Sequence, residues 1–409
     1  MPKSPTGLPS GIRVTDTITA TLFAKVFPVT AVNEILERHG CGTIRERHLP
    51  NEYVVYFILM MALFRDSALR EVFRIVAESF NRLRKKAGEP HIPTASALSQ
   101  ACSRISSDAF AEMFHRFCVP VSTGAVKGCF FKRWRKVAMD GSVIDVCDTE
   151  ENRDYFGTSK NQHQTQARFP KLRLCMLMEV GTHLTFSASM GPYSKGEIGL
   201  AQDLIPYIKP DMICIFDRNF FSFDMYSRIA ERGAAALFRL QKGLILRSDQ
   251  ILQDGSHLVT IYHHKDVARK NGVTARFFQY RVHGAKNKEM YFMLTNILDP
   301  NEASATELAA LYCERWEIEN TLDELKSHLN TENLLPRSKT PNRVKQEIWA
   351  LLMTHYVLRL NMFQAALIED FDPDRISFVH TIRVVQRTLA KSSFFSPEEA
   401  SSEDTQGDS

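Results

Sequence analysis

The sequence of 409 residues has no cysteine pattern that would hold a zinc ion or a disulfide framework. Its eight cysteines are scattered singly, without a Cys-X-X-Cys pair or a nearby pair of histidines at ligand spacing. No N-terminal stretch resembles a signal peptide, and the most apolar run, Tyr53–Phe64, is too short to span a bilayer. We therefore expect a protein of the reducing cytoplasm with no membrane partner, in which this run forms a buried helix.

Acidic and basic residues are unevenly distributed along the chain. The net charge is +4, but residues 396–409 carry five acids and no base, so the rest of the chain has a net charge of +9. Five basic residues alternate with aromatics in 127–137, and five more lie in 74–86. A phosphate backbone is the natural partner for such runs, although most charge runs are simply solvated surface.

Hydrophobic periodicity suggests an α/β protein with helices at both ends. The runs 136–148, 173–180 and 183–190 predict three successive strands in an antiparallel meander, after which helices and strands alternate as far as residue 240. This order predicts a mixed sheet covered by helices and interrupted by a β-rich insertion. The expected segments are a helical DNA-binding domain (1–130), the first part of a core (131–240), the insertion (241–298), the second part of the core (299–372) and a C-terminal segment with a disordered acidic tail (373–409).

The stretch YCERWEIENTLDELKSHL, residues 312–329, predicts a long helix with many acids. At about 100° per residue, one arc of about 60° carries four of its side chains: Tyr312, Arg315, Glu319 and Lys326. Asp323 borders this arc, and Glu314, Glu317 and Glu324 are expected to face water. The simpler interpretation is that Glu319 and Asp323 only form intrahelical ion pairs with Arg315 and Lys326.

Two further acids occupy strands of the expected sheet. Asp140 lies within the first strand and Asp217 ends the apolar strand 211–217. Taken singly, Asp140-Gly141 suggests a hairpin turn and Asp217 a loop-capping acid. An acid on a first strand, an acid ending a fourth and an acid on a later helix together match the layout of a ribonuclease-H-like core.

Residues 312–326 match without a gap the signature Y-(x2)-R-(x3)-E-(x6)-K of the IS-four family of DDE insertion-sequence transposases. The segments 138–157 and 214–226 resemble the family's two aspartate segments, and 49–73 and 96–105 resemble its N-terminal helical region. This resemblance extends to about residue 370. Asn219 departs from it, because many relatives have glycine there. Some relatives form hairpin-ended DNA and stabilise a flipped base with a tryptophan of the insertion. This insertion has no tryptophan, so the candidates for stacking on such a base are other aromatic residues: Phe277, Phe278, Tyr280 and Tyr291.

The resemblance implies a DNA transposase that binds terminal inverted repeats and performs cut-and-paste transposition in the bacterial cytosol, associated with the nucleoid. It implies a catalytic, metal-binding triad of Asp140, Asp217 and Glu319, with Tyr312, Arg315 and Lys326 as accessory residues. Two Mg²⁺ or Mn²⁺ ions are the expected cofactors, and the expected partners are double-stranded DNA of element ends and target and a second copy of the chain. The alternatives are a ribonuclease-H-fold nuclease and a catalytically inactive DNA-binding relative.

Overall fold

The computed structural model describes residues 22–43, 49–83, 91–159, 168–244, 246–281, 290–329, 336–368 and 373–391. The chain divides into two compact units. Residues 119–323 form the sheet unit, and residues 1–118 together with 324–409 form the helical unit. The five segments expected from the sequence remain a prediction.

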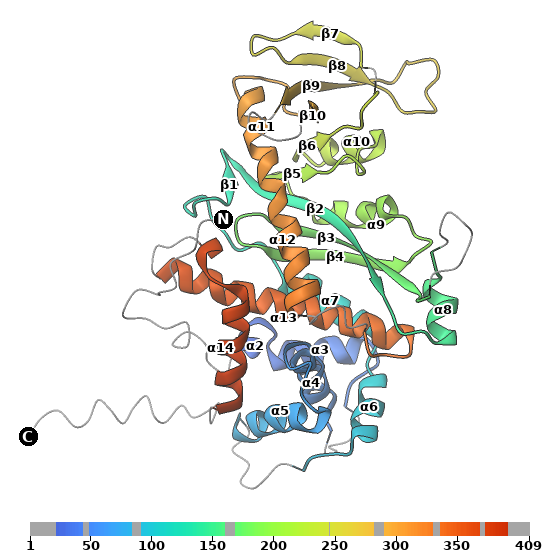
Figure 1. Ribbon diagram of the computed structural model, residues 1–409, viewed down its shortest axis with the longest axis vertical. Coiled ribbons are helices and arrows are strands. Elements are labelled where there is room, and N and C mark those ends of the chain that lie inside the picture. Colours follow the sequence, from blue (N-terminus) through green and yellow to red (C-terminus); the bar gives the residue numbers. More distant parts are fainter. Residues whose placement is uncertain are drawn as a thin grey trace, which may run out of the picture. The chain divides into compact units, whose positions relative to one another are not determined.

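The sheet unit is built on one mixed sheet (Figure 1). Within the described residues its strands are β1 (Phe130–Phe131), β2 (Trp134–Asp145), β3 (Lys171–Glu179), β4 (Leu184–Pro192), β5 (Met212–Phe216), β6 (Ala235–Arg239), β7 (Ser248–Ile251), β8 (His257–Ile261), β9 (Val273–Arg281) and β10 (Met290–Thr295). They lie in the order β4-β3-β2-β5-β6-β10-β9-β8-β7, and β1 pairs with β2.

The pairing confirms the expected meander and mixed sheet. Strands β2, β3 and β4 are antiparallel neighbours, whereas β5 pairs in parallel with both β2 and β6. The strands of the expected insertion do not form a separate layer. Strand β10 pairs with β6, and β9, β8 and β7 follow in antiparallel order, so the insertion extends the same sheet.

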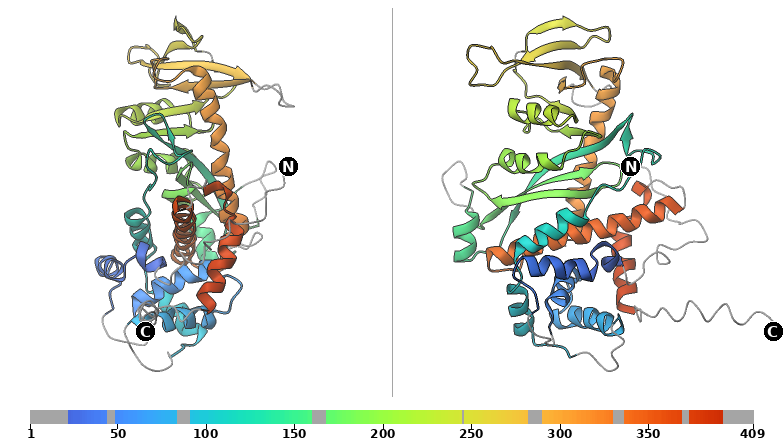
Figure 2. Two further views of the ribbon diagram at one scale, coloured as in Figure 1. Left: turned by 90° about the vertical axis from the view of Figure 1, so that its left-hand side faces the viewer. Right: turned by 180° about the vertical axis from the view of Figure 1, so that it is seen from behind.

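Helices cover both faces of this sheet. Helices α9 (Glu197–Leu204) and α10 (Phe223–Glu231) pack on one face through apolar side chains that include Leu200 and Met225. Helix α11 (Ala305–Cys313) packs on the other face through Leu308 and Leu311. The edge-on view in Figure 2 shows the two sets on opposite sides. The unit also contains α8 (Glu150–Phe156) and the 3₁₀ turn η1 (Ile205–Tyr207).

The expected long helix from Tyr312 is not a continuous α-helix. Helix α11 is followed by the 3₁₀ turn η2 (Glu314–Trp316), the helix α12 (Glu317–Asp323) and the π-helical segment η3 (Glu324–Leu329). A 3₁₀ turn has about 3.0 residues per turn, and a π-helix is wider than an α-helix. The uniform rotation of about 100° per residue was therefore wrong for this stretch.

The basic run 127–137 is used inside the sheet unit. Its last four basic residues each form an ion pair there: Lys132 with Glu307, Arg133 with Glu302, Arg135 with Glu179, and Lys136 with Glu314. These pairs tie β1 and β2 to neighbouring elements of the same unit, so much of the run's charge has an internal partner. In the run 74–86, Arg74 lies 3.6 Å from Glu71, and the side chains of 79–86 lie outside the described residues.

The helical unit combines both ends of the chain. Its elements within the described residues are α2 (Leu22–Val26), α3 (Val29–Arg38), α4 (Asn51–Leu63), α5 (Leu69–Leu83), α6 (Ala95–Ser103), α7 (Ser107–Phe117), η3, α13 (Pro341–Ile368), η4 (Pro373–Arg375) and α14 (Phe378–Lys391). The predicted buried helix is confirmed, because nearly every side chain of α4 is buried. The short helices α6 and α7 begin at side-chain caps supplied by Thr94 and Ser106. No helix of the described residues is both long and apolar enough to cross a membrane.

A buried ion-pair network in the helical unit overturns one sequence expectation. Glu324 was expected to face water, but it is buried and accepts hydrogen bonds from His355 Nε2 at 3.0 Å and Arg359 Nε at 2.9 Å. Burial alone would raise the pKa of this carboxyl, but His355 and Arg359 outweigh it and lower the pKa to about 2. Both partners lie on α13, so Glu324 joins η3 to the core of this unit.

Glu324→Gln should lower the free energy of unfolding at pH 7 by about 3–5 kcal/mol, because Arg359 would stay buried without its counter-charge. The folded-state pKa of about 2 lies below the ordinary value of 4.5. The carboxylate's stabilisation is thus fully present above pH 4.5 and is lost as the pH falls toward 2. Denaturant unfolding of both proteins across this range measures the difference, which should shrink in acid. The exposed Glu37→Gln is the control; equal stability of Glu324→Gln and wild type at pH 7 would contradict the network's role.

Candidate active site

The register between β2 and β5 brings two of the predicted acids together. These strands are parallel, and Met139 pairs with Phe216 at the end of the ladder. The next residues along the two strands are Asp140 and Asp217. Neighbouring strands lie about 4.8 Å apart, so two acids 77 positions apart in sequence become neighbours at one point of the sheet.

The strand continues through Asp140 and Gly141, so the hairpin-turn interpretation was wrong. Asp140 pairs with Met176 and Gly141 with Cys175 in the regular antiparallel ladder to β3. A Cβ atom at position 141 would lie 2.1 Å from Oε1 of Glu197, which leaves no room for any residue but glycine without moving that carboxylate. Gly141 therefore allows Glu197 to lie directly beside the Asp140 backbone.

Glu197 is a fourth carboxylate of this region, and it is not among the residues predicted from the sequence. It is the first residue of α9, and burial raises its pKa, as do the charges of Asp140 and Asp217, while Arg173 opposes the shift. Its only signal in the sequence was an acid at the start of an expected helix. Acids are common there because they interact favourably with the helix dipole, so the signal did not stand out.

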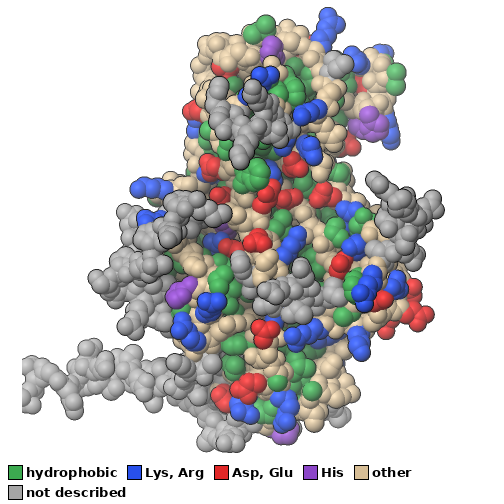
Figure 3. Space-filling model, viewed as in Figure 1, with side chains coloured by type: hydrophobic (Ala, Val, Ile, Leu, Met, Phe, Trp, Pro, Cys, Tyr) green, Lys and Arg blue, Asp and Glu red, His purple; other side chains and the backbone are tan. Residues whose placement is uncertain are grey.

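The third predicted acid comes from α12 on the opposite helix layer. Glu319 is about half exposed, and acidic side chains gather on the surface around α12 (Figure 3). Arg315 lies between the acids: its Nη2 donates to Glu319 Oε1 at 2.8 Å, and its Nη1 is 3.9 Å from Asp140 Oδ2. The expected Arg315–Glu319 intrahelical pair is therefore present, but Arg315 also reaches a strand acid. Glu319 thus forms the intrahelical ion pair and also belongs to the group of acids around Asp140.

The electrostatics of Asp140 reflect this crowding. Burial raises the pKa of its carboxyl, and the charges of Asp217 and Glu319 raise it further. The backbone N–H of Gly141, which donates to Oδ1 at 2.8 Å, and the guanidinium of Arg315 act in the opposite direction. The net direction is upward, so the fold holds these carboxylates together at a cost in electrostatic free energy.

Ion pairs from the sheet hold the helical stretch that carries Arg315 and Glu319. The buried Lys136 of β2 bonds to the Glu314 carboxylate, and Nε2 of buried His183 lies 3.3 Å from Glu317. The hydroxyl of Thr321 donates to the sulfur of Met178 in β3 at 2.7 Å. Glu314 and Glu317, expected to face water, are thus partly exposed but engaged with the sheet.

The accessory residues differ in their surroundings. Tyr312 is buried, burial raises its pKa to about 12, and its ring meets Tyr291 edge-on with centroids 6.3 Å apart. Lys326 is exposed on η3 and belongs to the helical unit. The structure thus gathers Asp140, Asp217, Glu319, Arg315 and Tyr312 within the sheet unit.

The aromatic candidates of the insertion are largely occupied in packing. Phe278 is buried in the core, and Phe277 stacks on Phe292. Tyr280 and Tyr291 stack on each other at 5.1 Å, and the guanidinium of Arg239 lies 4.5 Å from the Tyr291 ring centroid.

The donor chemistry of the cluster suits a hard divalent cation. Carboxylate oxygens are the ligands that Mg²⁺ and Mn²⁺ prefer, and four carboxylates face mainly Arg315 and Arg173 as counter-charges. The described residues contain no group of three or more His, Cys, Asp or Glu side chains already gathered at metal-ligand spacing. The positive charge of Arg315 reduces the repulsion among the carboxylates around Asp140, and a bound cation would reduce it further. The residues therefore fit a divalent cation by their charge and by their oxygen ligands.

Comparisons with known proteins support the sequence resemblance. Residues 17–115 match the family described as insertion element 4 transposase N-terminal, and residues 134–357, more than half of the chain, match the transposase DDE domain family. The transposase InsG for insertion sequence element IS4 of Escherichia coli strain K12 is 27% identical over 367 residues, covering 88% of this chain and 80% of the relative.

Two other proteins are similar over different extents. The putative transposase InsZ of the same organism is 24% identical over 214 residues, covering 52% of this chain and 69% of the relative. A solved structure of a piggyBac transposase synaptic complex with hairpin DNA is 11% identical, with a TM-score of 0.47, and the alignment covers 95% of this chain and 82% of that one.

Asp140→Asn should stabilise the metal-free protein at pH 7, because a neutral side chain escapes both burial of charge and repulsion by Asp217 and Glu319. The folded-state pKa of Asp140 is raised above 3.8, so the wild type loses stability as the pH rises through that pKa, and the gain of the variant should vanish below pH 3.8. Millimolar Mg²⁺ should raise the melting temperature of the wild type more than that of the variant. A variant less stable than wild type at pH 7, or an equal response to Mg²⁺, would contradict this account.

Proposed function

This chain belongs to the insertion-element transposases with a DDE domain, enzymes of DNA transposition, and we propose that Asp140, Asp217 and Glu319 carry out its cleavage and joining of DNA. The observation that supports this proposal most is the convergence of the three acids. They come from β2, from the end of β5 and from α12. The charges of Asp217 and Glu319 both raise the pKa of Asp140.

We assign the three carboxylates to the binding of two divalent cations, Mg²⁺ or Mn²⁺. When bound, such cations activate the attacking oxygen and neutralise charge on the leaving oxygen. Asp140 and Asp217 are side by side and suit a shared ligand role, and Glu319, being more exposed, completes the set from the helix. No serine or cysteine nucleophile is required for this reaction.

The proposed reaction has two steps at the same carboxylates. A water oxygen forms a bond to phosphorus at the element end, the bond to the 3′ oxygen breaks, and a 3′-hydroxyl is released. That hydroxyl then attacks a phosphate of the target DNA, forming a new phosphodiester bond and displacing the target's own 3′ oxygen. Two ends must be handled together, so we propose a homodimer on double-stranded DNA, in the cytoplasm.

The accessory residues have roles that follow from their surroundings. We propose that Arg315, which already bridges Asp140 and Glu319, shifts one of its N–H groups to a phosphate next to the scissile bond when DNA binds. Tyr312 is buried beneath it and supports the guanidinium, whose carbon lies 5.9 Å from the tyrosine ring centroid. Lys326, exposed and flexible in its stem, is proposed as a second phosphate contact.

Incubating the protein with labelled element ends, a target plasmid and Mg²⁺ tests the proposed function. Wild type should nick the ends and join them to the plasmid. The isosteric variants Asp140→Asn, Asp217→Asn and Glu319→Gln should each reduce both steps by at least about a thousandfold, equal to about 4 kcal/mol. Asp203→Asn, an exposed acid on α9, is the matched control and should retain activity. Cleavage without any joined product would instead indicate a nuclease, and full activity of a triad variant would exclude that residue from the site.

Arg315→Ala should slow joining by about 10- to 100-fold, the equivalent of one charge-assisted hydrogen bond of about 1.5–3 kcal/mol. The apparent affinity for DNA ends should fall. The metal-free variant should fold but melt at a lower temperature than wild type, because Arg315 no longer offsets the repulsion among Asp140 and the neighbouring acids. The control is Arg133→Ala, which removes an exposed arginine of the same unit. If Arg315→Ala instead changes only the Mg²⁺ concentration needed for half-maximal activity, Arg315 organises the carboxylates and does not contact phosphate.

A further inference from the structure

A cationic hollow in the helical unit lies outside the candidate active site. It has a volume of about 460 Å³, and its described lining comes from four segments: the end of α4 with the turn that follows it, the first turn of α5, one face of α6, and residues 336–351 at the start of α13. Its floor is apolar, with Ile58, Met61 and Leu351. Its polar lining includes four basic side chains, Arg65, Arg337, Lys339 and Arg343.

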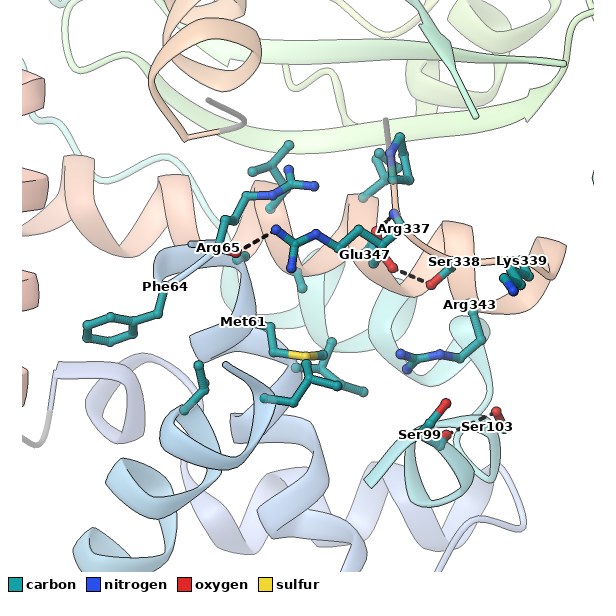
Figure 4. Close-up of a pocket in the computed structure, with 18 of the residues that line it drawn as sticks. Met61, Phe64, Arg65, Ser99, Ser103, Arg337, Ser338, Lys339, Arg343 and Glu347 are labelled. Carbon is teal, nitrogen blue, oxygen red and sulfur yellow. Dashed lines mark hydrogen bonds between the residues drawn. The ribbon is translucent and has the colours of Figure 1, made fainter. Parts of the chain in front are cut away.

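The basic side chains converge on the hollow from two directions. Figure 4 shows Arg337, from the segment before α13, and Arg343, from the first turn of α13, reaching across it, with Met61 facing them and Ser99 and Ser103 below. Arg337 is fixed there, because its Nη2 donates to the backbone carbonyl of Arg65 at 2.7 Å. Arg343 Nη1 donates to Gln346 Oε1 at 2.7 Å.

Positive charge exceeds negative charge in this lining. Among the described residues of the lining, Glu347 is the one acid, and its carboxylate accepts hydrogen bonds from the backbone N–H of Arg337 and the hydroxyl of Ser338. Burial lowers the pKa of Arg65, and the nearby Arg337 lowers it further, against the attraction of Glu347. The long helix α13 also begins here, so its positive dipole end adds to the field.

A second basic hollow adjoins the first. It shares Phe64 and Ser67 with the first hollow. Its charged lining consists of Arg383 and Arg387 of α14 and the single acid Asp66, so basic side chains outnumber the acid in its described lining. One small anion would use a single hollow, whereas two adjoining cationic hollows suit an extended polyanion with charges at regular intervals. A nucleic-acid backbone has this property.

We propose that Arg65, Arg337 and Arg343 bind the phosphodiester backbone of double-stranded DNA at this hollow, an inference that rests on the proposed function. The site contacts phosphates and not bases, because the charged groups of its described lining are mainly guanidinium groups, which pair with phosphate oxygens. Neither of the two basic runs of the sequence, 74–86 and 127–137, contains these arginines. No sequence pattern marks the site, because Arg65 is far along the chain from the pair Arg337 and Arg343.

The double variant Arg337→Ala/Arg343→Ala tests the inference through the salt dependence of DNA binding. Fluorescence anisotropy with a labelled duplex carrying an element end, in metal-free buffer, gives the slope of log K against log[salt]. Each lost phosphate contact should reduce the magnitude of this slope by about 0.9, so the double variant should lose about 1.8 and bind about 60-fold more weakly at 0.1 M salt. The control Lys25→Ala/Arg116→Ala removes the same charge from exposed helices of the same unit and should change the slope by less than one contact.

Two further measurements separate the outcomes. Arg337→Lys/Arg343→Lys keeps the charge and should restore the wild-type slope; if it does not while its melting temperature is normal, the contact is not simply electrostatic and the inference is wrong. Inorganic phosphate at matched ionic strength tests the other source of the anion. If phosphate raises the melting temperature of the wild type but the alanine variant keeps the wild-type slope with DNA, the hollow is a small-anion site and the DNA assignment fails.

The inference and the proposed function fail in different ways. If wild type cuts and joins element ends but the alanine variant binds DNA as wild type does, only the inference is overturned. If the triad variants cut as wild type does, the proposed function is overturned, whereas the salt slopes still report on this hollow.

Discussion

The parallel pairing of β2 with β5 is the constraint on which the candidate site depends. Backbone hydrogen bonding fixes the register of the two strands up to Met139 and Phe216, and this register places the next residues, Asp140 and Asp217, beside each other. A slip of one residue would turn one of the acids to the other face of the sheet. The antiparallel partner β3 extends past this point and pairs with Asp140 itself, so the backbone at Asp140 is held from that side where the charges meet.

Crowded carboxylates need compensation, and Arg315 provides it. It is buried, it reaches both the strand acid Asp140 and the helix acid Glu319, and it comes from a 3₁₀ turn between two helical segments. The sheet in turn holds this turn and α12 through Lys136, His183 and Met178. The helix that carries the third acid is thus fixed by polar contacts as well as by its apolar residues such as Ile318.

The two units use their basic residues differently. In the sheet unit, four of the five basic residues of the run 127–137 form ion pairs with acids of the same unit, so much of the run's positive charge is matched internally. In the helical unit, arginines from the turn after α4, from the segment before α13 and from the first turn of α13 converge on one hollow, and the described part of its lining holds a single acid. Charge in three dimensions, and not along the chain, decides where a polyanion is attracted.

The sequence by itself determined the α/β class, the meander, the buried helix α4 and the triad candidates, because alternation of apolar residues and a fixed-offset signature are local properties. It also identified Tyr312, Arg315 and Glu319 as a group, through spacing alone. Only the tertiary structure decided the rest. Four features depend on contacts between residues far apart in the chain. They are the continuation of the sheet through the insertion, the burial of Glu324 against α13, the approach of Glu197 to Gly141 and the hollow around Arg337. No local pattern encodes such contacts, since each partner alone looks like an ordinary surface residue.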